Sequence, residues 1–415
     1  MLNNHRVVIT GLGVISSIGI GWEEFWDNLL KGKSGISPVT SFDTTNHITH
    51  NGGEVKNFKP EEFIPEEKIK LLNRSSQLAF AAAKLAIEDA YLSQENYPSP
   101  LPLPQGEGAR GRVGICIGTT TGSIQAIEHI NDRIISNKEI GKELISQLPP
   151  HTTPSTIARE FDLNGPNFMF STACAAGNYA IGYGFDLIRS KRADVIIAGG
   201  SDPFSRISFT GFNQFSVSAP EKCQPFDKNR KGMMVAEGAG ILVLELLEIA
   251  IRRNAPIYAE ISGYGLSCDA EHMTQPSVDG ISECMIKAMR EAKIETEDVD
   301  YICAHGTGTT SNDKTECAAI KEVFGPLYKK MPVSSIKSML GHPMGAASAL
   351  EAIACALAVK NDIIPPTINY ETPDPECDID CVPNKSRQHP VNIALNNSYA
   401  FGGNNACLVV KKFIE

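Results

Sequence analysis

The order of sequence patterns along this 415-residue chain occurs twice. RVVITGLGVIS near the start resembles IYAEISGYGLS from Ile257, and VGICIGTTTG from Val113 resembles VDYICAHGTGT from Val299. Each half closes with an apolar strand-like run, GAGILVLE in the first and NNACLVV in the second. A duplicated pattern predicts two homologous halves. We expect them to span residues 1–252 and 253–415.

Strand-like runs alternate with helical patterns in both halves. VVIT, VGICIG, VIIAGG and YICAH are short apolar runs, whereas SSQLAFAAAKLAIEDAY has helical periodicity. This alternation predicts an α/β fold in layers, with mainly parallel strand pairing. The content of 42% hydrophobic and 21% charged residues is typical of a folded globular protein and excludes wholesale disorder.

Charge and cysteine usage restrict the class of function. The formal net charge of −10, without a basic run, argues against a nucleic-acid binder. The eleven cysteines are scattered, and no leader precedes RVVIT, which favours a reduced, cytoplasmic compartment. The best candidate for a membrane span, AGILVLELLEIAI, is interrupted by Glu245 and Glu248, so we expect none.

The segment SQENYPSPLPLPQGEGARGR, residues 93–112, differs from its surroundings in proline and glycine content. It predicts an exposed, mobile loop inside the first half. Gly106, Gly108 and Gly111 have the spacing G-x-G-x-x-G, but a proline tract precedes them and a strand follows. A dinucleotide-binding loop needs the opposite context, so we expect no nucleotide site here.

The run FMFSTACAAGNYAIG, residues 168–182, places Cys174 between an apolar strand-like stretch and a helix of small residues. Gly177, Gly182 and Gly184 each cost about 1 kcal/mol relative to alanine in an exposed helix, so we expect the close approach of another backbone or of a ligand to compensate. GAASALEAIACALA, from Gly345, has the same small face. We expect the two helices to pack on each other at the centre of the molecule.

Cys174 would then lie on a sharp strand-to-helix turn, like the nucleophile elbow of hydrolases. One cysteine among eleven is more often a small buried hydrophobe. The turn favours a nucleophile instead. The helix dipole and the free backbone N–H groups predict a stabilised thiolate with a lowered pKa.

Two histidines follow strand-like runs in the second half. His305 ends YICA and opens GTGTT, and His342 precedes the second small-faced helix. We expect both to face Cys174. A metal site is the alternative, but the three residues are far apart in sequence and Cys377 with Cys381 does not supply the missing ligands, so we predict no metal.

A thiolate with two neutral imidazoles suits decarboxylative carbon–carbon bond formation. The thiolate takes an acyl group from a thioester, and the histidine N–H groups bind a malonyl thioester oxygen and stabilise the enolate formed as carbon dioxide leaves. In a cysteine protease one histidine would act as the base, and the second would be unexplained.

The chain resembles the β-ketoacyl-acyl carrier protein synthases, specifically the elongating type II synthases and the similar ketosynthase α subunits of type II polyketide synthases. The resemblance covers nearly the whole chain, through STACAAG, QPFDKNRKGMMVAEGAG, AHGTGTTSND, PVSSIKSMLGHPMGAA and NSYAFGGNNA. It implies a thiolase-like αβαβα fold, a dimer, and a site of one cysteine and two histidines. It also implies no cofactor bound by the protein itself, with substrates carried on the phosphopantetheine arm of an acyl carrier protein.

Carried over residue by residue, the resemblance makes Cys174 the nucleophile and His305 and His342 the catalytic histidines. Lys337 matches the family's active-site lysine, with Glu351 as its expected partner. Phe401 corresponds to the gating phenylalanine, whose backbone N–H joins that of Cys174 in the oxyanion hole.

Three further residues match positions that bind the substrate in the family and take no direct part in the chemistry. Thr307 and Thr309 offer hydroxyls to the phosphopantetheine arm, and Phe212 matches a second gate residue. The chain has Asn404 and Ala400 where family members usually have threonine and glycine. Candidates for docking an acidic carrier are Lys68, Lys70 and Arg74.

Two alternative functions remain within related folds. A non-catalytic chain-length-factor-like partner subunit would lack the cysteine, and a degradative thiolase would need a second cysteine near the C-terminus, where this chain has phenylalanine. The partners expected for a condensing enzyme are the carrier protein and either a second copy or a chain-length-factor-like paralogue.

Overall fold

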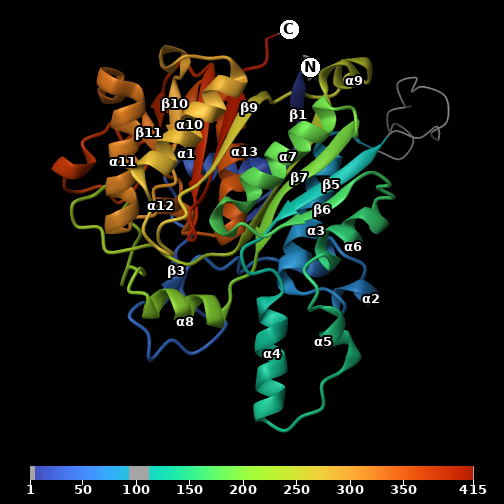
Figure 1. Cartoon of the computed structure of the whole chain (residues 1–415). Helices are drawn as coiled ribbons and strands as arrows, with labels where there is room; N and C mark the ends of the chain where they lie inside the picture. Colours follow the sequence, from blue (N-terminus) through green and yellow to red (C-terminus); the bar gives the residue numbers. More distant parts are fainter. Residues whose placement is uncertain (1–4, 93–111, 415) are drawn as a thin grey trace.

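The computed structural model describes residues 5–92 and 112–414. Of the loop expected at residues 93–112, only Arg112 lies inside the described part of the chain. Ten strands form the main path of one large sheet, and helices lie on both of its faces and in its middle (Figure 1).

Each half contributes five strands to this path. From the junction outward, the first half supplies β1 (Val7–Ser16), β8 (Gly238–Leu246), β7 (Val195–Asp202), β5 (Val113–Gly118) and β6 (Asn167–Phe170). The second supplies β9 (Ala259–Cys268), β15 (Asn404–Lys411), β14 (Ile393–Tyr399), β10 (Tyr301–Cys303) and β11 (Val333–Ser334). Short strands are β2 (Gly19–Ile20), β3 (Ser37–Pro38), β4 (Asn51–Gly52), β12 (Ile363–Ile364) and β13 (Arg387–Gln388).

The two sets of strands have the same internal order, and β1 and β9 join them. The junction is antiparallel and short, pairing Val7 with Ile261 and Ile9 with Ala259. Each set begins with a long strand and its antiparallel neighbour, β1 with β8 and β9 with β15. The strand order therefore repeats the order of the sequence patterns. The division between residues 252 and 253 itself stays a prediction.

The prediction of mainly parallel pairing is wrong. Among the named strands of residues 5–92 and 112–414, the parallel pairs lie at the outer strands, where β5 pairs with β6 and β7 and β10 pairs with β11 and β14. Strands β8 and β15 run antiparallel to both of their neighbours. Alternation of strands and helices does not reveal this. Strand β15 follows β14 directly through a short hairpin at residues 400–403, and β8 follows β7 through a long connection, residues 203–237, that does not act as a crossover to a parallel strand.

The helices form three layers. In the middle, α7 (Ala176–Arg189) and α13 (Ala347–Asn361) contact strands of both halves. The outer layers are α3 (Arg74–Asp89) with α6 (Thr152–Glu160), and α10 (Val278–Ala292) with α11 (Thr310–Phe324). The predicted thiolase-like αβαβα layering is confirmed (Figure 1).

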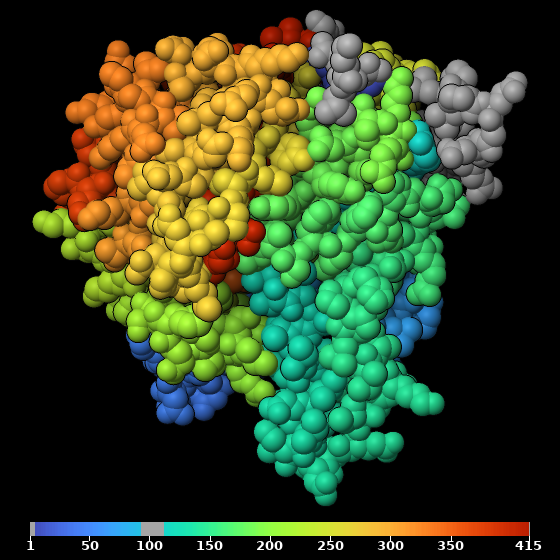
Figure 2. Space-filling view, viewed as in Figure 1, coloured from blue at the N-terminus to red at the C-terminus, as the bar shows by residue number. Residues whose placement is uncertain are grey.

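The other helices connect or extend these layers. They are α1 (Trp22–Leu30), α2 (Glu66–Ile69), α4 (Ile124–Ile135), α5 (Lys142–Ser146), α8 (Arg206–Gln214), α9 (Leu247–Arg252) and α12 (Lys337–Leu340). Helices α4 and α5 project from the body of the molecule (Figures 1 and 2). No helix in residues 5–92 or 112–414 is long and apolar enough to cross a membrane.

The small residues of α7 permit its close contacts. A Cβ at Gly177 would lie 2.7 Å from Oγ of Ser348 and 2.8 Å from the backbone nitrogen of Ala349, so this glycine allows α13 to approach, as predicted. At Gly182 the obstacle would be the ring of Tyr264 on β9, at 2.5 Å. The glycines thus accommodate a helix on one side and a strand on the other.

Candidate active site

Cys174 lies in a single turn, Ala173–Ala175, between the end of β6 at Phe170 and the start of α7. Ala173 has a φ of 49°, a left-handed conformation that a residue with a side chain rarely adopts. This tight turn between strand and helix is the elbow that the sequence predicts. The Cys174 side chain is buried, with 9% of the residue exposed.

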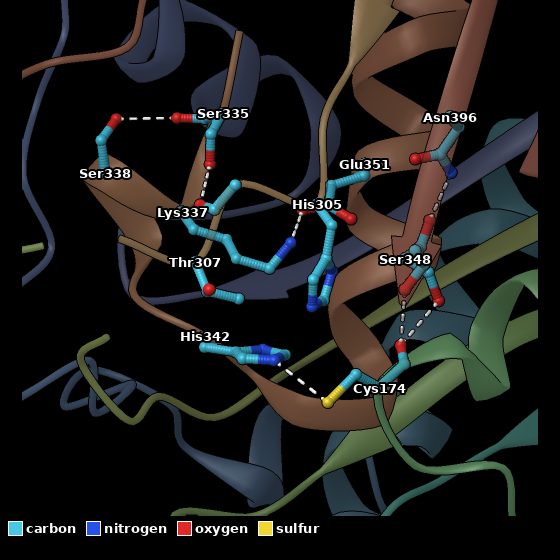
Figure 3. A network of polar contacts seen from close by, with 12 residues as sticks. Cys174, His305, Thr307, Ser335, Lys337, Ser338, His342, Ser348, Glu351 and Asn396 are labelled. Carbon is cyan, nitrogen blue, oxygen red and sulfur yellow. Dashed lines mark hydrogen bonds and ion pairs between the residues drawn. The ribbon is translucent and has the colours of Figure 1, made fainter. Parts of the chain in front are cut away.

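The main chain of Cys174 is held from the second half. Its carbonyl oxygen accepts hydrogen bonds from Oγ of Ser398 on β14, at 3.1 Å, and Oγ of Ser348 on α13, at 3.3 Å. Ser348 also accepts a bond from the backbone N–H of Asn178, at 3.0 Å. Figure 3 shows Ser348 beside this carbonyl. Neither serine stands out in the sequence, because their partner lies on a different half of the chain.

The two histidines flank the sulfur (Figure 3). Nε2 of His342 lies 3.1 Å from Sγ of Cys174. The His305 and His342 ring centroids are 5.5 Å apart and the rings are nearly perpendicular, at 82°. One ligand atom from each of the three side chains falls within 4.8 Å of the others. The structure therefore brings together the three residues expected to meet.

Both imidazoles are uncharged at neutral pH. Burial lowers the pKa of His305 and of His342 well below the usual value, and the charge of Lys337 lowers both further. Nδ1 of each ring has no hydrogen-bond partner among the described residues. Thus no described carboxylate orients either ring, as the sequence suggests.

Glu316 supports His305 through the main chain. Its carboxylate accepts the backbone N–H groups of His305 and Gly306, each at 2.8 Å, from within helix α11. Ser335 donates to the carbonyl oxygen of Gly306 at 2.6 Å. The sequence predicts neither contact. A buried glutamate eleven positions after a histidine gives no local signal of this bond.

Lys337 and Glu351 form an ion pair at the back of the site. Both side chains are 1% exposed, and Nζ of Lys337 donates to Oε1 of Glu351. Burial raises the pKa of Glu351 to about 7, although the lysine opposes this shift. Figure 3 shows the lysine directed toward Glu351. The expected pairing is present, which favours an electrostatic role for Lys337 over a role as nucleophile or base.

The expected low pKa of Cys174 is wrong. Burial raises the pKa of this thiol to about 12, Asp202 and Glu351 add to the rise, and Lys337 only partly opposes it. Desolvation of the sulfur is the largest cause, and the sequence does not reveal it because burial depends on packing from both halves. The resting nucleophile is therefore a neutral thiol in contact with His342.

This correction predicts the pH dependence of alkylation. The rate of Cys174 modification by iodoacetamide should rise about tenfold per pH unit from pH 7 to 10, because only the thiolate reacts. Peptide mass spectrometry measures the rate, with the exposed Cys268 as internal reference. A rate that is already constant between pH 6 and 8 would show a lowered pKa and overturn the correction.

The catalytic candidates open into a cavity of about 220 Å³. Its wall includes Phe212 and Phe401, whose ring centroids are 6.1 Å apart, and Thr307 and Thr309, whose Oγ1 atoms are 2.9 Å apart. Figure 2 shows a hollow on this face, where the red C-terminal chain lies between yellow and green segments. Tyr399, which the sequence did not single out, lines the wall and contacts the His305 ring at 5.7 Å between centroids.

Of the cations expected to dock a carrier, Arg74 is unsuitable. Its guanidinium donates to the buried Glu237 and to the carbonyl oxygen of Val55, so it holds two parts of the fold together. Lys68 is in an ion pair with Glu160, and Lys70 is exposed. The sequence does not predict the pairing of Arg74 with Glu237 or of Lys68 with Glu160, because each pair is far apart along the chain.

The argument from sequence spacing against a metal does not hold in three dimensions. Cys174, His305 and His342 offer one sulfur and two nitrogens close enough to share a soft metal ion. The same sulfur is the candidate nucleophile, so a metal and an acyl group would compete for it.

Comparison with known proteins places the whole chain in one family. The family model "Beta-ketoacyl synthase, N-terminal domain" matches residues 4–250, and its C-terminal counterpart matches residues 258–371. The chain is 39% identical to 3-oxoacyl-[acyl-carrier-protein] synthase 2 of Staphylococcus aureus (strain COL), covering 100% of both chains. It is 38% identical to the protein of that name from Synechocystis sp., covering 99% of both.

Solved structures give the same result. A chain of the ishigamide ketosynthase/chain length factor superposes with a TM-score of 0.94 and 42% identity, over 99% of this chain and 100% of that one. A second solved structure is a type II polyketide synthase acyl-carrier protein in complex with its ketosynthase. One of its chains superposes with a TM-score of 0.90 and 32% identity, over 99% of this chain and 100% of that one. These matches extend over both halves. The chain belongs to the β-ketoacyl synthase family.

Proposed function

We propose that this protein is a β-ketoacyl-acyl carrier protein synthase, an acyltransferase that extends a carrier-bound acyl chain by decarboxylative condensation with malonyl-carrier. The observation that carries this assignment is the meeting of a buried thiol with two uncharged imidazoles at the end of one cavity. Full-length similarity to 3-oxoacyl-[acyl-carrier-protein] synthases supports it.

In the first step, Sγ of Cys174 attacks the acyl thioester carbonyl. The thiol proton passes to Nε2 of His342, at 3.1 Å, and the carrier thiol leaves with a proton. The oxyanion is stabilised by the backbone N–H groups of Cys174 and Phe401. The bonds from Ser348 and Ser398 fix the Cys174 main chain throughout this step.

In the second step, a malonyl thioester enters the same cavity beside Thr307 and Thr309. His305 and His342 donate hydrogen bonds to its thioester oxygen while the bond to the carboxylate breaks and carbon dioxide leaves. The resulting enolate carbon attacks the acyl group on Cys174, and the carbon–sulfur bond breaks. The sulfur leaves as a thiolate and takes up one proton from water, which restores the thiol. Lowered imidazole pKa values suit this role, because a neutral ring that is not a strong acid stabilises the enolate without protonating it.

The remaining features of the proposal concern assembly. The two halves divide between residues 252 and 253, and Phe212 and Phe401 form the gate. The protein acts in the cytoplasm, which eleven free cysteines support. It works as a dimer with a second copy or with a chain-length-factor-like paralogue, because one structural relative is a ketosynthase with its chain length factor.

A combined acylation and condensation assay tests the function. We expect incubation with acyl-carrier to add one acyl mass to the peptide containing Cys174. Subsequent malonyl-carrier should remove this mass and release one carbon dioxide per β-ketoacyl product. The matched control is carrier that bears no acyl group. A purified protein that forms no adduct on Cys174, while its paralogue carries the acyl group and the pair releases product, would be the non-catalytic partner.

A further inference from the structure

The wall of the cavity above Cys174 has an unusual charge for this chain. Apart from histidines, Lys231 is the charged residue on the described wall, which includes no aspartate, glutamate or arginine. The whole chain has a formal net charge of −10, so a wall without a carboxylate is not a consequence of composition. An anionic group that enters this cavity meets a cation and no like charge.

The main chain at Lys231 is fixed on both sides. The Arg230 side chain is 2% exposed, pairs with Asp374 and lies 3.9 Å from Asp313. On the other side, the backbone N–H of Gly232 donates to the carbonyl oxygen of Gly308 at 2.9 Å. Lys231 itself is exposed, and no ion pair to it is found in the described part of the chain. The backbone of Lys231 is thus held at the wall, and its ammonium group is available to a ligand.

Polar groups lie on the same cavity wall as Lys231. Gly308 lies between the two threonines proposed to bind the substrate arm, and residues 310–312 in the first turn of α11 line the same wall. Backbone N–H groups at the start of a helix favour an anion. Asp313 in that turn is buried, and its carboxylate accepts the N–H groups of Phe226 and Gly308 and faces Arg230, so its charge is compensated.

We propose that Lys231 binds the phosphodiester of the phosphopantetheine arm of the carrier. The proposal rests on the proposed function, because only a carrier-bound substrate brings a phosphodiester into this cavity. The malonyl carboxylate is the other anion of the reaction. It must reach the two buried histidines beside Cys174, whereas Lys231 is exposed, so the phosphodiester is the group that matches its position.

Three malonyl thioesters distinguish the ligand of Lys231: malonyl-carrier, malonyl-phosphopantetheine without protein, and malonyl-pantetheine without phosphate. For Lys231→Glu we expect kcat/KM to fall roughly 10-fold to 100-fold with the first two, through KM, since a charge-assisted hydrogen bond is lost. With malonyl-pantetheine it should change less than about twofold, because there is no phosphate to contact. Lys231→Arg should keep kcat/KM higher for the two thioesters that contain phosphate than for malonyl-pantetheine, as in the unaltered protein.

The matched control is Lys228→Glu, which makes the same charge change at an exposed position outside the cavity wall. We expect it to leave all three kcat/KM values unchanged. An equal loss with all three thioesters, a loss with malonyl-carrier alone, or no loss at all for Lys231→Glu would each overturn the phosphodiester contact. Failure of the proposed function differs from these, since the unaltered protein would then condense none of the three.

Discussion

Replacing Cys174 by alanine is expected to abolish acyl transfer and to lower the rate of condensation by at least about 10³-fold, because the covalent route is lost. The sulfur that contacts His342 at 3.1 Å has no substitute in the cavity wall, which includes no second cysteine among the described residues. Intact-protein mass spectrometry measures the acyl adduct, and product analysis with malonyl-carrier measures condensation.

The matched control for this variant is Cys116→Ala. Cys116, on β5, is also buried but lies outside the cavity wall. It should retain the adduct and most of the activity, although the smaller side chain can reduce stability. Condensation that persists in Cys174→Ala, or an adduct on another peptide, would contradict the assignment of Cys174.

Replacing Lys337 by methionine is expected to lower the free energy of unfolding by about 3–5 kcal/mol, because Glu351 would remain as a buried carboxylate without its partner. Both side chains are 1% exposed, so water cannot compensate for the loss. Urea unfolding monitored by circular dichroism measures the change. The acidic limb of the pH–activity profile should also move to higher pH, because the lysine charge lowers the pKa of both histidines.

Two further variants show whether the loss of stability in Lys337→Met comes from the uncompensated charge of Glu351 or from the removal of a lysine in general. Lys412→Met removes an ion pair with Asp362 whose members are 26% and 43% exposed, and should cost at most about 1 kcal/mol. The double variant Lys337→Met with Glu351→Leu should recover part of the stability, since no uncompensated charge remains. A cost below about 1 kcal/mol for Lys337→Met alone would contradict the electrostatic role.

The sequence predicts the fold and the central residues because these depend on order and local pattern. The repeated motifs anticipate the repeated strand order, and the small residues around Gly177 anticipate contact with α13. Likewise, the turn before α7 and the loops that follow two strand-like runs place Cys174, His305 and His342 near one another.

What could not be predicted depends on contacts between distant residues. The pKa of Cys174 is set by burial, which comes from elements of both halves. Arg74 looked available for a carrier because its partner Glu237 lies 163 positions away. Lys231 lies in a polar run, DKNRKG, that resembles any exposed loop until the cavity beside it is known.

The two serine hydroxyls on the carbonyl of Cys174 have a practical consequence. Both hydroxyls bind the main-chain carbonyl oxygen and not the sulfur, so we expect the turn at residues 173–175 to keep its conformation when the sulfur is removed. We therefore expect the Cys174→Ala variant to bind an acyl-carrier but to be unable to accept its acyl group. That variant is accordingly suited to trapping the encounter between enzyme and carrier for crystallography.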